Sequence, residues 1–249
     1  DLHEDPRRQR HMCIRDSIKN GEVIDGTGAP KFKSDIVIDK GKIIGVFPPE
    51  NGDVRDPSEN HFLSNFKAKH IINAENKIIS PGFIDVHTHD DDNVFLDPSM
   101  SSKISQGVTT CVAGNCGISL APFSYKGEVP APIALLGKSE VFRFPRVSDY
   151  KEEFNNKPSS VNLALLTGHS MLRVEAMNGE FARSATTKEI SKMVDKLKLA
   201  LEDGSIGLST GLAYPAANDA PTSEIIELAK ILPEFDGIFT THMRNEAVD

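Results

Sequence analysis

The chain has 249 residues, and its 28 lysines and arginines against 36 aspartates and glutamates give a net charge of −8. This acidic balance argues against general binding to nucleic acid or to anionic membranes, because both require excess positive charge. No apolar run approaches the roughly 18 residues that a membrane-spanning helix needs. We expect one large globular domain, or one such domain with a smaller one.

The first 17 residues follow neither a strand nor a helix pattern. A short basic run around Arg7, Arg8 and Arg10 could be a nucleic-acid arm, but a solvated tail fits an acidic chain better. We therefore expect residues 1–17 to be a disordered tail that is not native to the protein. No apolar segment of a secretory signal is present in this stretch.

The next segment, residues 18–80, is built of short strand-like runs separated by turn residues. Alternating apolar residues and a Lys40-Gly41 turn are typical of antiparallel hairpins. We expect this segment to be the N-terminal part of a small β-sandwich unit.

From Pro81 onward, apolar strands alternate with helices, which is typical of parallel strands in an α/β fold. The helix signals are Asp97-Pro98, which predicts a short helix to about residue 106, and Thr186 with Glu189, which form a capping box. A further helix is expected over 223–232. Five strands are expected at 83–89, 108–114, 161–167, 205–211 and 237–242.

Residues that can bind metal stand at the ends of these strands, where barrels of this kind carry their active sites. His87 and His89 end the first strand, and side chains two apart on a strand face the same side. Cys116 follows the second strand, and His242 ends the fifth. Imidazole and thiolate ligands suit Zn²⁺, so a zinc site is expected here.

Each candidate has a purely structural alternative. The two strand histidines could be buried and hydrogen-bonded, and a cysteine is often a small apolar core residue. Cys111 lies mid-strand, where that role is favoured, and His169 could equally be a ligand or cap a turn. Asp85, Asp90 and Asp91 flank the histidines and could accept imidazole N–H bonds or be solvated loop acids.

The cysteines also bear on the cellular compartment. Cys13, Cys111 and Cys116 are sparse and odd in number, which does not make a disulfide framework. A reduced, cytoplasmic protein is therefore expected.

The segment IISPGFIDVHTH at 78–89 resembles the first metal-binding strand of the amidohydrolase superfamily. Further segments narrow the resemblance to the N-acyl-D-amino-acid deacylases, and it extends over residues 18–249. These segments are SQGVTT at 105–110, GNCGI at 114–118, GHS at 168–170, GLSTGLAYP at 207–215 and THMRNE at 241–246.

The resemblance implies a zinc site in which Cys116 and His242 hold a tightly bound ion and His87 and His89 form a second, weaker position. Tyr214 matches a residue that contacts the substrate carboxylate in this family, although a packed loop tyrosine is the alternative. Many amidohydrolases bridge two metals with a carboxylated lysine on the fourth strand. No lysine occurs at 205–215, which fits Cys116 as the replacement ligand.

The implied reaction is hydrolysis of N-acyl-D-amino acids, small-molecule substrates, to a carboxylate and a D-amino acid. The family's general base is an aspartate of the last barrel strand, which is expected beyond residue 249. A complete (β/α)₈ barrel takes about 250 residues. We therefore expect an incomplete barrel of five strands and an N-terminal fragment that is inactive and poorly soluble alone, with no catalytic base of its own.

Two other functions remain compatible with the sequence. A cyclic-amide hydrolase of the dihydroorotase or hydantoinase type shares the His-x-His strand but normally uses the strand-four lysine. A non-catalytic relative would use the barrel for assembly, although such proteins tend to lose metal ligands and this chain keeps four. Oligomeric state is not indicated by the sequence.

Overall fold

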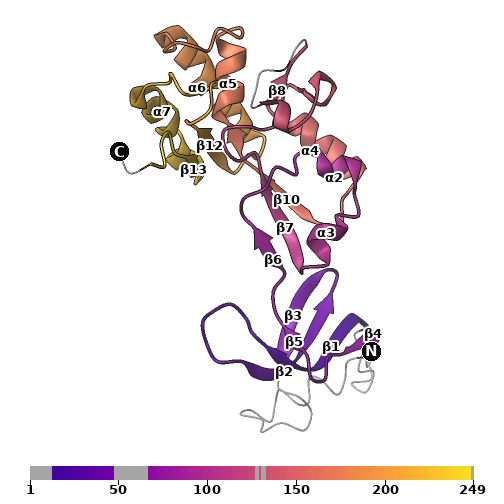
Figure 1. Cartoon of the computed structure of the whole chain (residues 1–249). Coiled ribbons are helices and arrows are strands. Elements are labelled where there is room, and N and C mark those ends of the chain that lie inside the picture. Colours follow the sequence, from indigo (N-terminus) through magenta and orange to yellow (C-terminus); the bar gives the residue numbers. More distant parts are fainter. Residues whose placement is uncertain (1–12, 48–66, 127–128, 130–132, 248–249) are drawn as a thin grey trace, which may run out of the picture. The chain divides into compact units, whose positions relative to one another are not determined.

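The computed structural model describes residues 13–47, 67–126, 129 and 133–247 (Figure 1). These residues fall into two compact units that meet at the Pro81–Gly82 bond, and each unit is described by itself. In the described part of the chain, no helix has the length and apolar character needed to cross a membrane.

The first unit is a five-stranded sheet around a long central strand. The strands are β1 (Cys13–Val23), β2 (Phe32–Asp39), β3 (Lys42–Phe47), β4 (Lys67–Asn73) and β5 (Ile78–Ile79). Strand β1 pairs antiparallel with β2 and parallel with β4 and β5, while β3 pairs antiparallel with β2. Among the described residues these strands make a single sheet, so no second layer of the predicted sandwich is present there.

The strand β1 begins within the predicted tail, so the prediction of disorder is wrong for residues 13–17. Ser17 pairs with Val37 of β2 on one side and with Ile71 of β4 on the other. Pairing on both sides satisfies the backbone polar groups of a segment whose own sequence shows no strand pattern. Residues 1–12 lie outside the described residues.

The second unit contains the five predicted strands, all parallel. One sheet holds β6 (Phe83–Asp85), β7 (Val108–Ala113) and β10 (Asn162–Leu165), and the other holds β11 (Thr167–Gly168), β12 (Gly207–Gly211) and β13 (Ile238–His242). Only Leu166 separates β10 from β11, so the third predicted strand joins both sheets. Strands that neighbour one another in chain order are typical of a (β/α) barrel. The α/β fold is thus an incomplete barrel (Figure 1).

Helices connect these strands. They are α2 (Asn93–Leu96), α3 (Ser101–Ile104), α4 (Val147–Asn156), α5 (His169–Ala176), α6 (Thr187–Glu202) and α7 (Thr222–Ala229), with single 3₁₀ turns at Ile133–Leu135, Ser139–Val141 and Leu232–Phe235. A short antiparallel pair of β8 (Phe123–Ser124) and β9 (Arg143–Phe144) precedes α4.

The helix predicted to start at Asp97-Pro98 is wrong in its bounds. Asp97 ends α2 instead, because its backbone N–H donates to Asn93 O and its carbonyl accepts from Met100 N. The chain then turns through Met100, which has a left-handed φ of 45°, before α3 begins. Asp97 does act as a local acceptor, for the Ser99 hydroxyl at 2.5 Å.

The helix predicted from the capping box is confirmed. The backbone N–H of Glu189 donates to Thr186 Oγ1 at 3.3 Å, and the backbone N–H of Thr186 donates to Glu189 Oε2 at 2.7 Å. The two bonds satisfy N–H groups that have no partner within the helix. Leu197 and Leu201 of α6 pack with Leu172 and Leu228 in an apolar cluster shared by α5, α6 and α7.

Candidate metal centre

His87 and His89 lie in the loop after β6, since the strand ends at Asp85 rather than at residue 89 as predicted. The two side chains nevertheless point to the same side, as they would on a strand. Thr88, between them, is buried, and both its backbone N–H and its hydroxyl donate to Val112 O, at 3.0 and 3.1 Å. With Thr88 turned towards β7, the two imidazoles share the opposite side.

Cys116 comes from the loop after β7, and its conformation is unusual. The residue has a left-handed φ of 55°, between Gly114 and Gly117, which also have positive φ values. Left-handed backbone is sparsely populated by residues other than glycine. The residue is 6% exposed, so the thiol is held inward.

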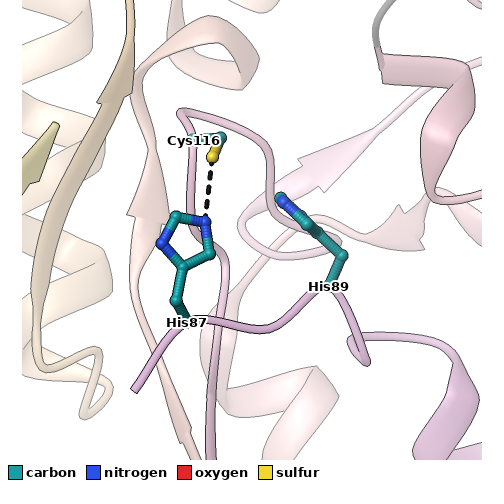
Figure 2. Close-up of side chains that lie close together, drawn as sticks. All are labelled: His87, His89 and Cys116. Atoms are coloured by element: carbon teal, nitrogen blue, oxygen red, sulfur yellow. Dashed lines mark hydrogen bonds between the residues drawn. The ribbon is translucent and has the colours of Figure 1, made fainter. Parts of the chain in front are cut away.

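These three side chains form one cluster, shown in Figure 2. The nearest ligand atoms of His87, His89 and Cys116 all lie within 4.8 Å of one another. His87 Nε2 is 3.1 Å from Cys116 Sγ, and the two imidazole rings meet edge to face with centroids 5.8 Å apart.

The donor set and its surroundings fit a divalent metal ion. Imidazole nitrogen and thiolate sulfur are the ligands that structural and catalytic zinc sites use. His89 Nδ1 is buried without a hydrogen-bond partner, which is costly unless another group takes its lone pair. Burial, with a smaller contribution from the charge of His87, lowers the pKa of His89 and favours the neutral form that binds metal.

Tyr214 and His242 form a second group of side chains next to the thiol. His242 ends β13, and its Nδ1 is 3.1 Å from the Tyr214 hydroxyl. The Tyr214 side chain also hydrogen-bonds the thiol of Cys116, which opposes the effect of burial in raising the pKa of that thiol. The structure thus joins His242 to Cys116 through Tyr214 and leaves it outside the three-residue cluster.

Two of the flanking acids are ion-paired instead of bonding an imidazole. Lys103 of α3 lies 2.7 Å from Asp85 and 3.0 Å from Asp90. The hydrogen bond from Lys103 lowers the pKa of Asp85. Lys103 was not found from the sequence, because only the folded positions of α3 and β6 bring it to these acids.

Asp91 is neither ion-paired nor solvated. It is fully buried, and its carboxylate accepts from the backbone N–H groups of Gly114 and Leu120, each at 3.3 Å. Burial raises its pKa to about 7, against the opposing effect of these two hydrogen bonds.

His169 lies in a separate buried cluster and does not join the histidines of the metal site. It begins α5, and its Nε2 is 2.8 Å from Glu224 of α7. Arg173 binds both oxygens of Glu224 at 2.6 Å. Burial lowers the pKa of His169, with Arg173 adding to the effect. Cys111 is fully buried in β7, and both it and Cys116 are free thiols.

Comparison with known proteins gives the family of this chain. The profile of the amidohydrolase family matches residues 70–233, so the chain belongs to that family. The chain is 40% identical over 229 residues to a D-aminoacylase of Alcaligenes xylosoxydans xylosoxydans, covering 92% of this chain and 44% of that protein.

Solved structures give the same result. A crystal structure of a D-aminoacylase has a TM-score of 0.83 and 42% identity, covering 94% of this chain and 46% of that one. An N-acyl-D-glutamate deacylase from Bordetella bronchiseptica, complexed with zinc and a phosphonate mimic of the tetrahedral intermediate, has the same TM-score and coverage at 37% identity. The predicted resemblance to this group of deacylases is confirmed. The chain spans less than half the length of these relatives.

Proposed function

We propose that this chain supplies the metal-binding half of a zinc-dependent deacylase that hydrolyses N-acyl-D-amino acids. The observation that carries the proposal is the convergence of His87, His89 and Cys116 within 4.8 Å. The similarity to proteins named as deacylases of N-acyl-D-amino acids, and not to cyclic-amide hydrolases at comparable identity, supports this substrate class. Because the chain spans less than half of those relatives, the activity is proposed for the complete barrel.

In this proposal His87, His89 and Cys116 hold zinc, and His242 is a further ligand on the side of Tyr214. When bound, zinc supplies a Lewis acid for the acyl carbonyl and lowers the pKa of water. The free thiols of Cys111 and Cys116 support a cytoplasmic location, where cysteines stay reduced.

Tyr214 is proposed to bind the substrate carboxylate. Its hydroxyl lies between the Cys116 thiol and His242 Nδ1, and burial raises its pKa, so it remains a hydrogen-bond donor at neutral pH. Fixing the carboxylate there and the acyl group at the metal leaves two directions at Cα, one for the side chain and one for hydrogen, and the two enantiomers exchange them. A steric block along one of these directions would then distinguish D from L substrates.

Hydrolysis joins the oxygen of water to the acyl carbon, breaks the C–N bond and releases the nitrogen, with a proton, as the free amine. A base must accept a proton from the water. Asp85 and Asp90 are held by Lys103, and Asp91 is held by backbone N–H groups. As the resemblance to the deacylases implies, we propose that the base is an aspartate of the last barrel strand, outside these 249 residues.

Zinc binding tests the ligand assignment. The chain loaded with zinc and dialysed is expected to retain the metal, and Cys116→Ala is expected to lose at least one equivalent. Cys111→Ala is the matched control, because that thiol is buried in β7, and its zinc content should equal that of the parent. Unchanged zinc content in Cys116→Ala would refute the assignment, and no zinc in the parent would favour a non-catalytic relative.

Turnover tests the reaction. A polypeptide that contains this chain and completes the barrel should release amine from N-acetyl-D-methionine. It should act much more slowly on the L enantiomer and should not open a hydantoin ring. Hydrolysis of the hydantoin alone would instead establish the cyclic-amide alternative.

A further inference from the structure

We propose that Asp91 and Ser209 are positioning residues, which hold the Cys116 thiol against the two histidines by fixing the loop 114–120 at several backbone atoms. The proposal rests on the proposed function only for the identity of the metal, because the positioning itself is a property of the metal-free fold.

Asp91 ties the cysteine loop to the histidine loop. It lies two residues after His89, and one carboxylate accepts from the backbone N–H groups of Gly114 and Leu120, the two ends of the cysteine loop, at 3.3 Å each. Its own backbone is fixed in turn, because the buried Tyr150 hydroxyl donates to Asp91 O at 2.6 Å. This carboxylate therefore helps to set the spacing of the two loops.

Ser209 ties the same loop to β12. Its hydroxyl donates to Gly114 O at 2.5 Å and accepts from Gly117 N at 3.0 Å, so it spans the cysteine. A third support comes from α5, where Ser170 N donates to Gly117 O at 3.0 Å. Ser209 is fully buried, and its hydroxyl is thus committed to these two backbone groups.

The conformation of Cys116 explains why such support is needed. A left-handed backbone at a residue other than glycine persists only where its surroundings over-determine it. Relaxation of Cys116 to an ordinary backbone conformation would turn its Cβ, and hence the thiol, away from His87. The bonds from Asp91 and Ser209 flank the cysteine on both sides and oppose that relaxation.

The chemistry of Asp91 is also poorly suited to a purely stabilising role. A buried carboxylate is costly to desolvate and is usually paired with a cation. Within the described residues no lysine or arginine forms an ion pair with Asp91, whose partners are backbone N–H groups. What the carboxylate provides in return is the spacing between the histidine and cysteine loops.

Thiol reactivity of the metal-free full chain tests the proposal without relying on zinc or turnover. In a Cys13→Ser background, Asp91→Asn and Ser209→Ala are expected to speed the reaction of Cys116 with a disulfide reagent by about tenfold or more. Cys111, fully buried in β7, is the internal reference. The matched control is Asp92→Asn, the same change one residue along, since no hydrogen bond joins the Asp92 carboxylate to the cysteine loop among the described residues.

Cobalt(II) binding gives a second, spectroscopic readout. The parent is expected to show a sulfur-to-cobalt charge-transfer band, and both variants are expected to need about 10–100-fold more cobalt to reach it. Circular dichroism establishes that each variant is folded at the assay temperature. If the parent binds no cobalt while both variants still expose Cys116, the proposed function fails and the positioning role stands.

Folded variants with the parent's thiol reactivity and cobalt affinity would overturn the proposal. If Asp91→Asn does not fold, Ser209→Ala decides the matter alone, because it removes one hydroxyl and no charge. Failure of both variants to fold would assign the two residues to stability and would also overturn a positioning role.

Discussion

Arg173 illustrates how much of this molecule depends on single buried side chains. It is fully buried, and besides Glu224 it donates to the carbonyls of Ala216, Phe181 and Arg183 at 2.7–3.0 Å. Ala216 lies two residues after Tyr214, so this guanidinium fixes the loop that carries the tyrosine. The residues joined by these bonds lie up to 51 positions apart in the sequence, so no local sequence pattern indicated the bonds.

Replacing Arg173 with methionine should therefore be strongly destabilising. The substitution removes the cation paired with the buried Glu224 and leaves His169 as its remaining partner. Removing one member of a buried ion pair typically costs about 3–5 kcal/mol. Urea unfolding followed by circular dichroism would measure the loss. Lys196→Met is the control, because its ion pair with Glu175 is partly exposed and should matter far less. Equal losses in the two variants would contradict this account.

The buried imidazole of His169 should make stability depend on pH. Burial, Arg173 and Arg244 lower its pKa from the ordinary 6.5, against the opposing effect of Glu224. The unfolded chain then takes up a proton that the folded chain does not, so the contribution of neutral His169 is complete above pH 6.5 and declines as the pH falls below that value. His169→Gln cannot titrate.

The expected result is a steeper fall in the free energy of unfolding of the parent than of His169→Gln between roughly pH 6.5 and 5. Urea titrations at several pH values would measure both slopes. Asp91, with its pKa raised to about 7, acts in the opposite direction, because it favours the folded state at low pH. It is present in both proteins and cancels in the comparison. Parallel slopes would show that His169 is not held neutral.

At the scale of elements, local signals were reliable where the stabilising contacts are themselves local. The capping box at Thr186 and Glu189 predicted the start of α6, because both bonds form within one turn. The helix α5 was missed because it begins directly at His169, where the sequence indicated the end of a strand. The change of sheet at Leu166 also depends on two neighbouring strands, β7 and β12, and has no signal of its own.

The capping box gives a direct test at this scale. Thr186→Ala removes the acceptor for Glu189 N and should cost about 1 kcal/mol, the usual value for an N-cap threonine. Thermal unfolding would show a lower midpoint. Thr187→Ala, at the exposed first helical residue, makes the same chemical change without removing a cap and should leave the midpoint nearly unchanged.

At the scale of the whole molecule, the candidate site was predictable in part. His87 and His89 could be paired from their spacing, and Cys116 from its place after a strand. Two supporting residues could not be found: Lys103, which pairs with Asp85 and Asp90, and Ser209, which holds the cysteine loop. They come from α3 and β12 and meet these loops only in the fold. The contact between His242 and the Tyr214 hydroxyl likewise depends on how β12 and β13 pair.

The chain alone should hydrolyse no N-acyl-D-amino acid, even where it binds zinc. The described acidic residues beside the histidines are committed to Lys103 or to backbone N–H groups, and a base is lacking among them. Release of amine from N-acetyl-D-methionine, followed with a fluorogenic amine reagent, would check this. Turnover by the purified 249-residue chain that disappears in Cys116→Ala would contradict it.

The chain alone should also have low solubility, because its sheets end in exposed strands. Strands β6 and β13 end the strand order of the second unit, and they expose Ile84 at 61% and Phe239 at 44%. Exposed apolar edge strands promote association. The double variant Ile84→Lys and Phe239→Lys should raise the soluble fraction after expression, measured by centrifugation, whereas Ile36→Lys in the buried face of β2 should not.

The glycines around the cysteine restrict how this site could be re-engineered. A Cβ on Gly114 would collide with the carbonyl oxygen of Leu166, and one on Gly211 would collide with the carbonyl oxygen of Cys116. Both obstacles are main-chain atoms, which no rotamer change can move aside. A randomisation library at this site should therefore leave these two codons unchanged and vary the exposed residues beside Tyr214, Ala213 and Pro215.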